Sequence, residues 1–284
     1  MSAAPFDFDY QTRAPEPPLG RFVELLWYAR GTVPYTREKI APTGSTVAVF
    51  VLGDPIIETA DDGHAEPLRA ERSFIIGPHD RPVINQPTGE TYAVGIVSTA
   101  VGCEALFGVQ PARLRGRVEH LESMWPQAAP LRAELARAGD PAQMLQQLEA
   151  ALIDHHDASI PGLSRCERAV AMLTADPTTP IADIASALGV SHGHLDREFA
   201  RVVGLSPRVL ARIGRLRRLL AGIDARLDVD WADLALDLGW FDQAHLIRDF
   251  RRHTGVTPSQ YIAAQRDTYA LEQAGDAAGF VPER

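Results

Sequence analysis

Residues 181–207 read IADIASALGVSHGHLDREFARVVGLSP, and residues 231–258 read WADLALDLGWFDQAHLIRDFRRHTGVTP. With a shift of 50 positions and one extra residue in the turn of the second copy, the segments share twelve identities over 27 aligned positions. Self-similarity of this extent marks a duplicated structural unit. The last third of the chain therefore contains two copies of one small fold.

Each copy predicts a helix followed by a tight turn. In the first copy Ile181, Ile184 and Leu188 recur at the spacing that places them on one face of a helix. Gly189, like Gly239 in the second copy, follows this helix at the point where a left-handed residue can turn the chain sharply. A second helix is expected directly after each turn.

The second helix of each copy combines a buried face with an outward polar face. Ser191 is expected to cap it in the first copy, where Leu195 and Phe199 are the buried anchors. Leu246 and Phe250 are the equivalent anchors in the second copy. A helix, a tight glycine turn and a second helix with a polar outer face form the arrangement that lays a helix into the major groove of DNA.

A further helix is expected to start after each copy, at Ser206-Pro207 and at Thr257-Pro258, because proline suits the first helical position. The first of these helices, residues 207–222, joins the two copies. If it is rigid, it fixes the separation of the two outward helices. Both can then enter successive major grooves about one turn (~34 Å) apart.

Candidate contacts to DNA follow from the outward faces. Arg197 and Arg248 are the best base readers, because a guanidinium pairs bidentately with guanine O6 and N7. Asp196 either accepts from a cytosine or holds Arg197 in place, and the second role is favoured because phosphates repel a carboxylate. The base-reading set is His192, Gly193, Asp196, Arg197, Gln243, Ala244, Ile247 and Arg248. The phosphate-binding set is Arg201, Arg208, Arg212, Arg218, Arg251 and Arg252.

The second copy resembles the signature region of the AraC/XylS family of transcription regulators, and the resemblance extends over residues 165–266. It is carried by Gly239-Trp240, His245-Leu246, Phe250-Arg251 and Thr257-Pro258, with Tyr261 after them. The resemblance implies an all-helical domain of seven helices that binds double-stranded promoter or operator DNA. The family often adds an effector-binding or dimerising domain, so a small-molecule effector and a homodimer both stay open as partners.

The chain departs from the family pattern in three places. Gly193 stands where many members carry a larger base-contacting side chain, and Asp196 beside Arg197 adds an acid to the groove-facing surface. Leu219 of the connecting helix stands where a small alanine is common. These departures indicate a weaker or different base preference in the first copy. Residues 73–154 resemble more loosely an uncharacterised N-terminal domain of some family members, which names no ligand.

Upstream of the duplicated region the pattern changes to short β-like runs separated by turns, typical of a small barrel or sandwich. The expected strands are Phe22–Ala29, Thr46–Leu52, Ile56–Thr59, Ser73–Ile76 and Tyr92–Val97. Helical periodicity begins after Thr99 and includes an apolar stripe from Met144 to Leu152, on a helix starting at Asp140-Pro141. This stripe belongs either to the core or to a contact with a second subunit.

The expected fold class is therefore an α+β chain of two domains. An N-terminal sensory or oligomerisation domain, a small β-barrel or sandwich with following helices, occupies residues 1–160, led in by a loose proline-rich segment to residue 20. An all-α DNA-binding domain occupies residues 161–266, with its helix-turn-helix units at 181–203 and 231–254 joined by a linker helix. Residues 267–284 are expected to form a flexible tail.

Charge follows the same division. The formal net charge is −9 overall, and it divides into −8 for residues 1–161, +2 for residues 162–266 and −3 for the remainder. Basic charge therefore gathers where a phosphate backbone needs it. The sequence has no apolar run long enough for a membrane span and no basic leader, so a cytoplasmic protein without a membrane partner is expected.

Catalytic and metal sites are not expected, and neither is a cofactor. Cys103 and Cys166 are isolated and are expected to be buried thiols. The histidines of the N-terminal half are too scattered for a metal set, and its acidic residues are assigned to turns. These residues are His64, His79, His120, His155, His156, Asp54, Glu58, Asp61 and Asp62.

Two alternatives to a regulator follow from other classes of protein. One is a DNA-repair-type enzyme fused to a helix-turn-helix domain, which needs a reactive cysteine with an activating base, and Cys103 lies in an apolar neighbourhood without one. The other is a protein-interaction module that has kept the fold and lost DNA binding. A gel-shift assay on promoter fragments separates this module from a regulator.

Overall fold

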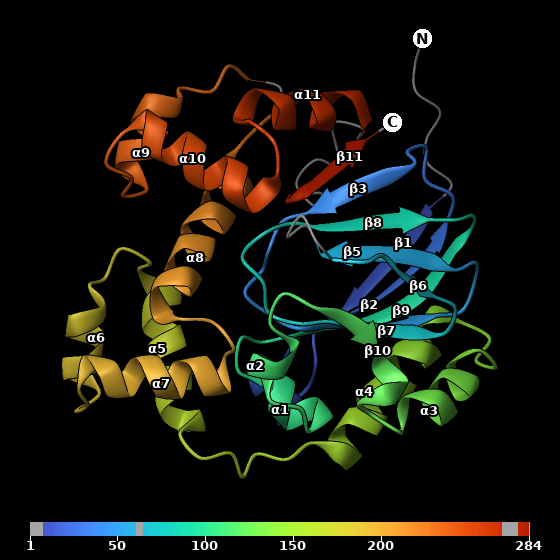
Figure 1. Cartoon of the computed structure of the whole chain (residues 1–284). Helices are drawn as coiled ribbons and strands as arrows, with labels where there is room; N and C mark the ends of the chain where they lie inside the picture. The colour runs from blue at the N-terminus through green and yellow to red at the C-terminus, as the bar shows by residue number, and fades with distance from the viewer. Residues whose placement is uncertain (1–7, 61–64, 226, 269–277, 284) are drawn as a thin grey trace.

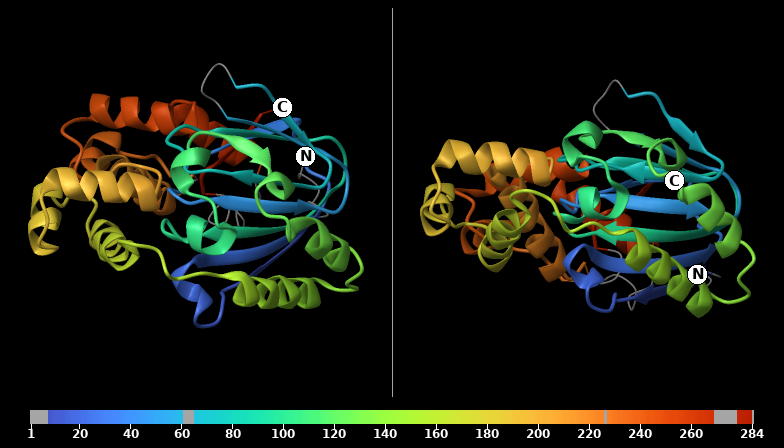
Figure 2. Two further views of the ribbon diagram at one scale, coloured as in Figure 1. Left: turned by 60° about the horizontal axis from the view of Figure 1, so that its bottom comes forward. Right: turned by 90° about the horizontal axis from the view of Figure 1, so that it is seen from below.

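A computed structural model describes residues 8–60, 65–225, 227–268 and 278–283 of the chain. Figure 1 shows a β-sheet domain followed by an all-helical region, which confirms the expected α+β class. The chain crosses from one part to the other near residues 156–161, which form no helix or strand. The two parts lie side by side (Figure 2), and one buried apolar cluster contains residues of both.

Two antiparallel sheets make up the first part. Both edges of each sheet as described are short strands. The six-stranded sheet has the order β1 (Phe8–Arg13), β2 (Val23–Gly31), β9 (Thr91–Ser98), β4 (Val47–Val51), β7 (Ser73–Ile76) and β10 (Val118–His120). The five-stranded sheet has the order β11 (Phe280–Glu283), β3 (Arg37–Ile40), β8 (Val83–Pro87), β5 (Ile56–Ala60) and β6 (Leu68–Ala70).

Helices cover the outer face of the six-stranded sheet. They are α1 (Gly102–Phe107), α2 (Pro111–Leu114), α3 (Ala128–Leu135) and α4 (Pro141–His155), with 3-10 turns at Leu19–Arg21 and Leu121–Ser123. Asp140 caps α4 by accepting from the Gln143 amide, as the sequence predicts. The apolar stripe from Met144 to Leu152 is buried in the core of this chain, which confirms the first of its two expected roles.

Seven helices follow in the described part of the chain, the number that the family resemblance implies. They are α5 (Leu163–Ala175), α6 (Ile181–Ala187), α7 (His192–Val202), α8 (Pro207–Gly222), α9 (Trp231–Asp237), α10 (Gln243–Thr254) and α11 (Pro258–Thr268). The linker helix α8 spans the predicted residues, because Ser206 accepts from the Val209 amide and Pro207 occupies the first turn. In Figure 1 α8 runs between the two helix-turn-helix units.

The apolar cores tie the two parts together. One buried cluster runs without a break from the space under α4 to Phe199 of the first helix-turn-helix unit and Ile213 of the linker helix α8. The second unit has its own cluster around Phe250, to which Ala41 and Val281 of the β-sheet domain contribute. A third cluster, around Phe74, fills the space between the two sheets. Packing therefore holds both units against the β-sheet domain.

The two chain ends differ from the expectation. Residues 8–13 form β1 inside the segment expected as a loose lead-in, and residues 280–283 form β11 inside the expected flexible tail. The tail has too little apolar surface to fold alone, but it folds as an added strand: Phe280 pairs with Ile40, and Glu283 pairs with Arg37. Residues 1–7, 269–277 and 284 lie outside the described residues.

Candidate DNA-binding surface

Both units have the predicted helix-turn-helix construction. Gly189 and Gly239 take left-handed backbone conformations with φ of 70° and 81° directly after α6 and α9. Ser191 then caps α7 by accepting from the His194 amide. Asp242 caps α10 by accepting from the His245 amide, a role that the sequence analysis did not assign. Although the second turn is one residue longer, each recognition helix therefore begins with a capping side chain.

The predicted anchors fix the orientation of α7 and α10. Leu195, Phe199, Leu246 and Phe250 are all fully buried. Because these residues lie on one face of each helix, the opposite faces point away from the cores. The outward faces of the two recognition helices are therefore set by packing.

The outward face of α10 presents three of the four predicted base readers. Gln243, Ala244 and Arg248 are exposed, whereas Ile247 is partly buried and packs against the core of its unit. Asp249 is turned inward, where its carboxylate accepts from Trp240 Nε1 at 3.0 Å. The exposed face of α10 therefore carries a guanidinium and an amide.

The outward face of α7 differs from the expectation in one contact. Arg197 and Gly193 are exposed, but Asp196 lies beside His192, with 3.4 Å between the carboxylate and Nε2. This pair is one helical turn apart, which brings the two side chains together. Among the described residues no ion pair holds Arg197, so the expected contact with Asp196 is not formed.

Three of the six predicted phosphate arginines already have partners within the protein. Arg218 donates to the carbonyls of Thr174 and Ala175 at the end of α5, at 2.8 and 2.6 Å. Arg201 pairs with Glu104 at 3.3 Å, and Arg252 pairs with Asp80 at 2.7 Å. The other three, Arg208, Arg212 and Arg251, are exposed and have no ion pair within the described part of the chain.

A hollow of about 540 Å³ lies between the two units. Arg208, Arg212 and Arg215 of α8 line it together with His192 and Gly239 from the two units. Arg215 is held in place by a hydrogen bond of 2.8 Å to the Gly239 carbonyl and by its position over the Trp240 ring. Three arginines of α8 therefore place positive charge on the wall of this hollow.

One contact between the second unit and the β-sheet domain is made by the loop that contains Asp80. The Asp80 carboxylate accepts from Arg252, and the Asp80 carbonyl accepts from His253 Nδ1 at 2.6 Å. Although burial acts to raise it, the pKa of Asp80 is lowered from its ordinary value by the Arg252 hydrogen bond and charge. Burial lowers the pKa of His253 and favours a neutral ring. Arg252, which is predicted to contact a DNA phosphate, and its neighbour His253 thus face the N-terminal domain.

The two cysteines lie in α1 and α5. Cys103 and Cys166 are buried free thiols, as expected, and burial raises the pKa of each to about 12. Such a thiol is a poor nucleophile because the thiolate is the reactive form. Within the described residues no group of three or more histidine, cysteine or acidic side chains is placed to hold a metal ion. None of the described helices has the length and apolar content needed to span a bilayer.

The structure corrects the assignment of Glu58 to a turn. Glu58 lies in β5 and is 2% exposed, with its side chain between the sheets. The alternation of Ile56, Glu58 and Ala60 was a signal for this placement, because alternate strand residues share a face. Asp54 does lie in a turn, where it accepts from the Glu90 amide. Asp61, Asp62 and His64 lie outside the described residues.

Two known families match the sequence. Residues 184–264 match a family described as a helix-turn-helix domain, and residues 11–120 match a family described as a domain of unknown function (DUF6597). No curated protein sequence matches the chain.

Some solved structures resemble most of the chain, and others resemble about a third of it. ToxT from Vibrio cholerae is 12% identical, with a TM-score of 0.48, over 89% of this chain and 98% of that one. A probable AraC family transcriptional regulator from Rhodopseudomonas palustris is 25% identical over 37% of this chain and 99% of its own, with a TM-score of 0.32. A regulator with an AraC-type DNA-binding domain from Chromobacterium violaceum is 27% identical over 36% and 92%, with a TM-score of 0.31.

Proposed function

We propose that the chain, an AraC-type helix-turn-helix DNA-binding regulator, recognises a specific operator through α7 and α10. The observation that supports operator recognition is the pair of anchored recognition helices, whose exposed faces carry Arg197, Gln243 and Arg248. The arginine-lined hollow between the units supports a duplex that contacts both. A gel shift with the intergenic DNA beside its own reading frame, followed by footprinting, tests this function. Failure to shift any promoter fragment would favour an interaction module.

The second recognition helix is expected to contribute more base discrimination than the first. Arg248→Ala should weaken operator binding by about 1–3 kcal/mol and relax the preference at one or two base pairs. Arg197→Ala should have a smaller effect, because Gly193 adds no side chain to the α7 face and Asp196 places a carboxylate there. Binding to a mapped site and to its single-base variants measures both. A larger loss for Arg197→Ala, with both variants folded, would reverse the assignment.

Phosphate contacts are expected to give operator binding a steep salt dependence. The slope of log affinity against log salt should be near −0.9 for each phosphate contacted. Arg251→Ala should make the slope shallower by about one such contact. Arg218→Ala is the matched control, because this exposed arginine donates to carbonyls of α5 and should leave the slope unchanged. An equal change in both variants would contradict the assignment of Arg251 to a phosphate.

We further propose that the N-terminal domain controls DNA binding through its contact with α10, rather than by dimerisation alone. Asp80 forms an ion pair with Arg252, which the sequence analysis assigns to a DNA phosphate. Breaking this ion pair would free the Arg252 guanidinium to bind a phosphate. The pairing of β11 with β3 provides a second tie between α11 and the β-sheet domain. A conformational change in the β-sheet domain can therefore act on the second unit through these two contacts.

Removal of the Asp80 carboxylate should therefore strengthen DNA binding. Asp80→Asn frees Arg252 while the backbone carbonyl that accepts from His253 remains, so the expected result is higher affinity at low salt and a salt slope steeper by about 0.9. Glu24→Gln is the control, because Glu24 also crosses the domain contact but pairs with Arg217, which lies outside the predicted phosphate set. Titrations of both variants at several salt concentrations measure the difference. An unchanged or shallower slope for Asp80→Asn would refute this role.

A further inference from the structure

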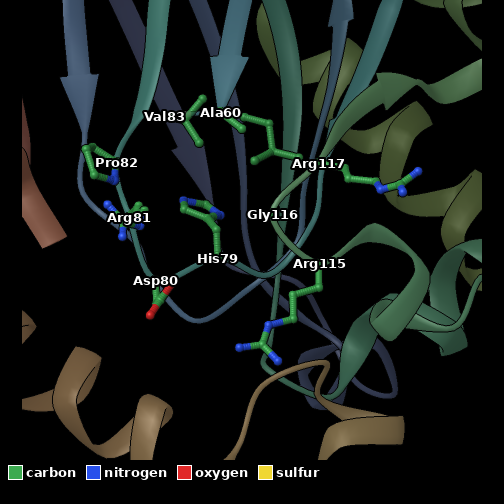
Figure 3. A pocket seen from close by; sticks show the side chains of 10 residues that line it. Ala60, His79, Asp80, Arg81, Pro82, Val83, Arg115, Gly116 and Arg117 are labelled. Carbon is green, nitrogen blue, oxygen red and sulfur yellow. The ribbon is translucent and has the colours of Figure 1, made fainter. Parts of the chain in front are cut away.

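The β-sheet domain has a cavity of about 250 Å³ beside its contact with α10. Ala60 of β5 and Val83 of β8, which are partners in register, form part of its apolar wall. Figure 3 shows these two side chains on one side of the His79 ring, whereas Asp80 and Arg115 extend on the opposite side. The cavity therefore has an apolar end and a charged end.

The charged side chains that line this cavity are mainly cationic. Arg81 follows Asp80 in the loop between β7 and β8, and Arg115 and Arg117 lie between α2 and β10. Among the described residues of the lining Asp80 is the only acidic one, and Arg252 already binds its carboxylate. Three guanidinium groups therefore surround the cavity, and its one carboxylate has a partner outside the lining.

Two of these three cations are available to a ligand. Arg117 pairs with Glu119 at 3.7 Å, and in Figure 3 its side chain extends away from the cavity. Arg81 and Arg115 are exposed, and neither forms an ion pair within the part of the chain that the structure describes. Guanidinium groups that gather without anions repel one another, and a bound anion relieves this repulsion. Arg81 and Arg115 are therefore the groups to which an anion would bind.

Other titratable groups of the domain do not change the sign of this charge. His79 Nδ1 donates to the Gly77 carbonyl at 2.8 Å, and burial lowers the pKa of the ring, which favours its neutral form. Glu38 and Glu58 are 5% and 2% exposed in β3 and β5, where burial raises the pKa of Glu38 to about 7, and neither belongs to the lining. Although residues 1–161 carry a net charge of −8, this cavity is positive and attracts anions.

We propose that this cavity binds a small organic anion, a carboxylate or a phosphate monoester, whose oxygens accept from Arg81 and Arg115 and whose short apolar part lies against the apolar wall. A guanidinium suits both headgroups because its N–H groups match pairs of carboxylate or phosphate oxygens. The cavity volume equals roughly eight water molecules, which limits the apolar part to a few carbon atoms. The proposal rests on the proposed function, for which it names the chemical class of the effector. The ligand would lie next to the ion pair between Asp80 and α10.

Binding is tested on the full chain with four probes that share a four-carbon chain. Butyrate and butyl phosphate are the anionic probes, and butanol and butylammonium are the neutral and cationic controls at matched ionic strength. We expect one or both anions to raise the melting temperature in a saturable manner, with an apparent affinity at least about tenfold higher than that of butanol or butylammonium. Comparison of the two anions identifies the preferred headgroup. The proposal is overturned if neither anion binds, or if butylammonium binds equally well.

The site is located with three arginine variants. Arg81→Gln and Arg115→Gln each remove one exposed cation, so both proteins should fold as the wild type does. Calorimetry should show at least about a tenfold loss of affinity for the bound anion in each. Arg113→Gln is the matched control, because Arg113 is an exposed arginine of α2 outside the cavity lining and its replacement should leave anion binding unchanged. Unchanged binding by either Arg81→Gln or Arg115→Gln would overturn the site, wherever else on the protein the anion binds.

Operator binding without ligand is measured separately on the wild-type protein. A protein that binds its operator but neither anion would refute the ligand proposal alone. A protein that binds an anion at Arg81 and Arg115 but no operator would refute the DNA-binding proposal, while the anion site would stand.

Discussion

Replacement of Phe250 by alanine is expected to destabilise the second helix-turn-helix unit by about 3–5 kcal/mol. Phe250 is fully buried, and its ring makes edge-to-face contacts with Trp231 and Tyr261 at centroid distances of 6.1 and 5.6 Å. The substitution removes both aromatic contacts, and their loss adds to the lost free energy of burying the ring. DNA binding should be lost through unfolding of the unit, and chemical denaturation measures this loss.

Phe241→Ala is the matched control for Phe250→Ala. Phe241 lies in the turn of the same unit but is 85% exposed, so its replacement should change the free energy of unfolding by no more than about 0.5 kcal/mol. Phe199→Ala, at the equivalent anchor of the first unit, should also cost about 3–5 kcal/mol because Phe199 is fully buried. A Phe250→Ala protein that melts like Phe241→Ala would show that the aromatic cluster does not anchor the unit.

The helical part of the fold was predictable because its information is local. The glycine turns, the Ser206-Pro207 start of α8 and the spacing of Leu195 and Phe199 each act within a few residues. Duplication provided a second test of the turn and anchor positions in each copy. The DNA-contacting roles of these residues stay predictions.

The missed strands have physical reasons. β1, β3, β6, β10 and β11 are at or next to a sheet edge and are short or largely exposed, so they lack the alternating apolar pattern that identifies a strand. β8 contains a proline at its end and is only partly buried. These strands form because a neighbouring strand offers hydrogen bonds, and that information lies far away in the sequence.

Contacts between the two parts could not be predicted from the sequence for the same reason. Asp80 and Arg252 are 172 positions apart, and nothing in either local sequence identifies the partner of the other. Arg252 therefore resembled any exposed cation of a recognition helix. The assignment of His192 rather than Arg197 as the partner of Asp196 is different, because its i,i+4 spacing was visible in the sequence.

Raising the pH from 6 to 8.5 is expected to destabilise the β-sheet domain relative to its Glu38→Gln variant. The Glu38 pKa is about 7 in the folded protein against an ordinary 4.5, so between these values the folded state binds more protons than the unfolded state. Stability from this group is complete below the ordinary value and is lost as the pH rises through about 7. The whole difference of 2.5 pKa units corresponds to about 3 kcal/mol.

The comparison with Glu38→Gln removes the other titrations in this range. The lowered pKa values of His79 and His253 act in the opposite direction below pH 7, since the unfolded state then binds more protons. These groups are present in both proteins and cancel in the difference. Glu58 shifts in the same direction as Glu38, and the Gln variant weakens that shift because part of it comes from the Glu38 charge. Between pH 6 and 8.5 the wild type should lose roughly 1–2 kcal/mol more than Glu38→Gln in urea unfolding followed by far-UV circular dichroism. Parallel stability curves for the two proteins would mean that water reaches the Glu38 carboxylate in solution.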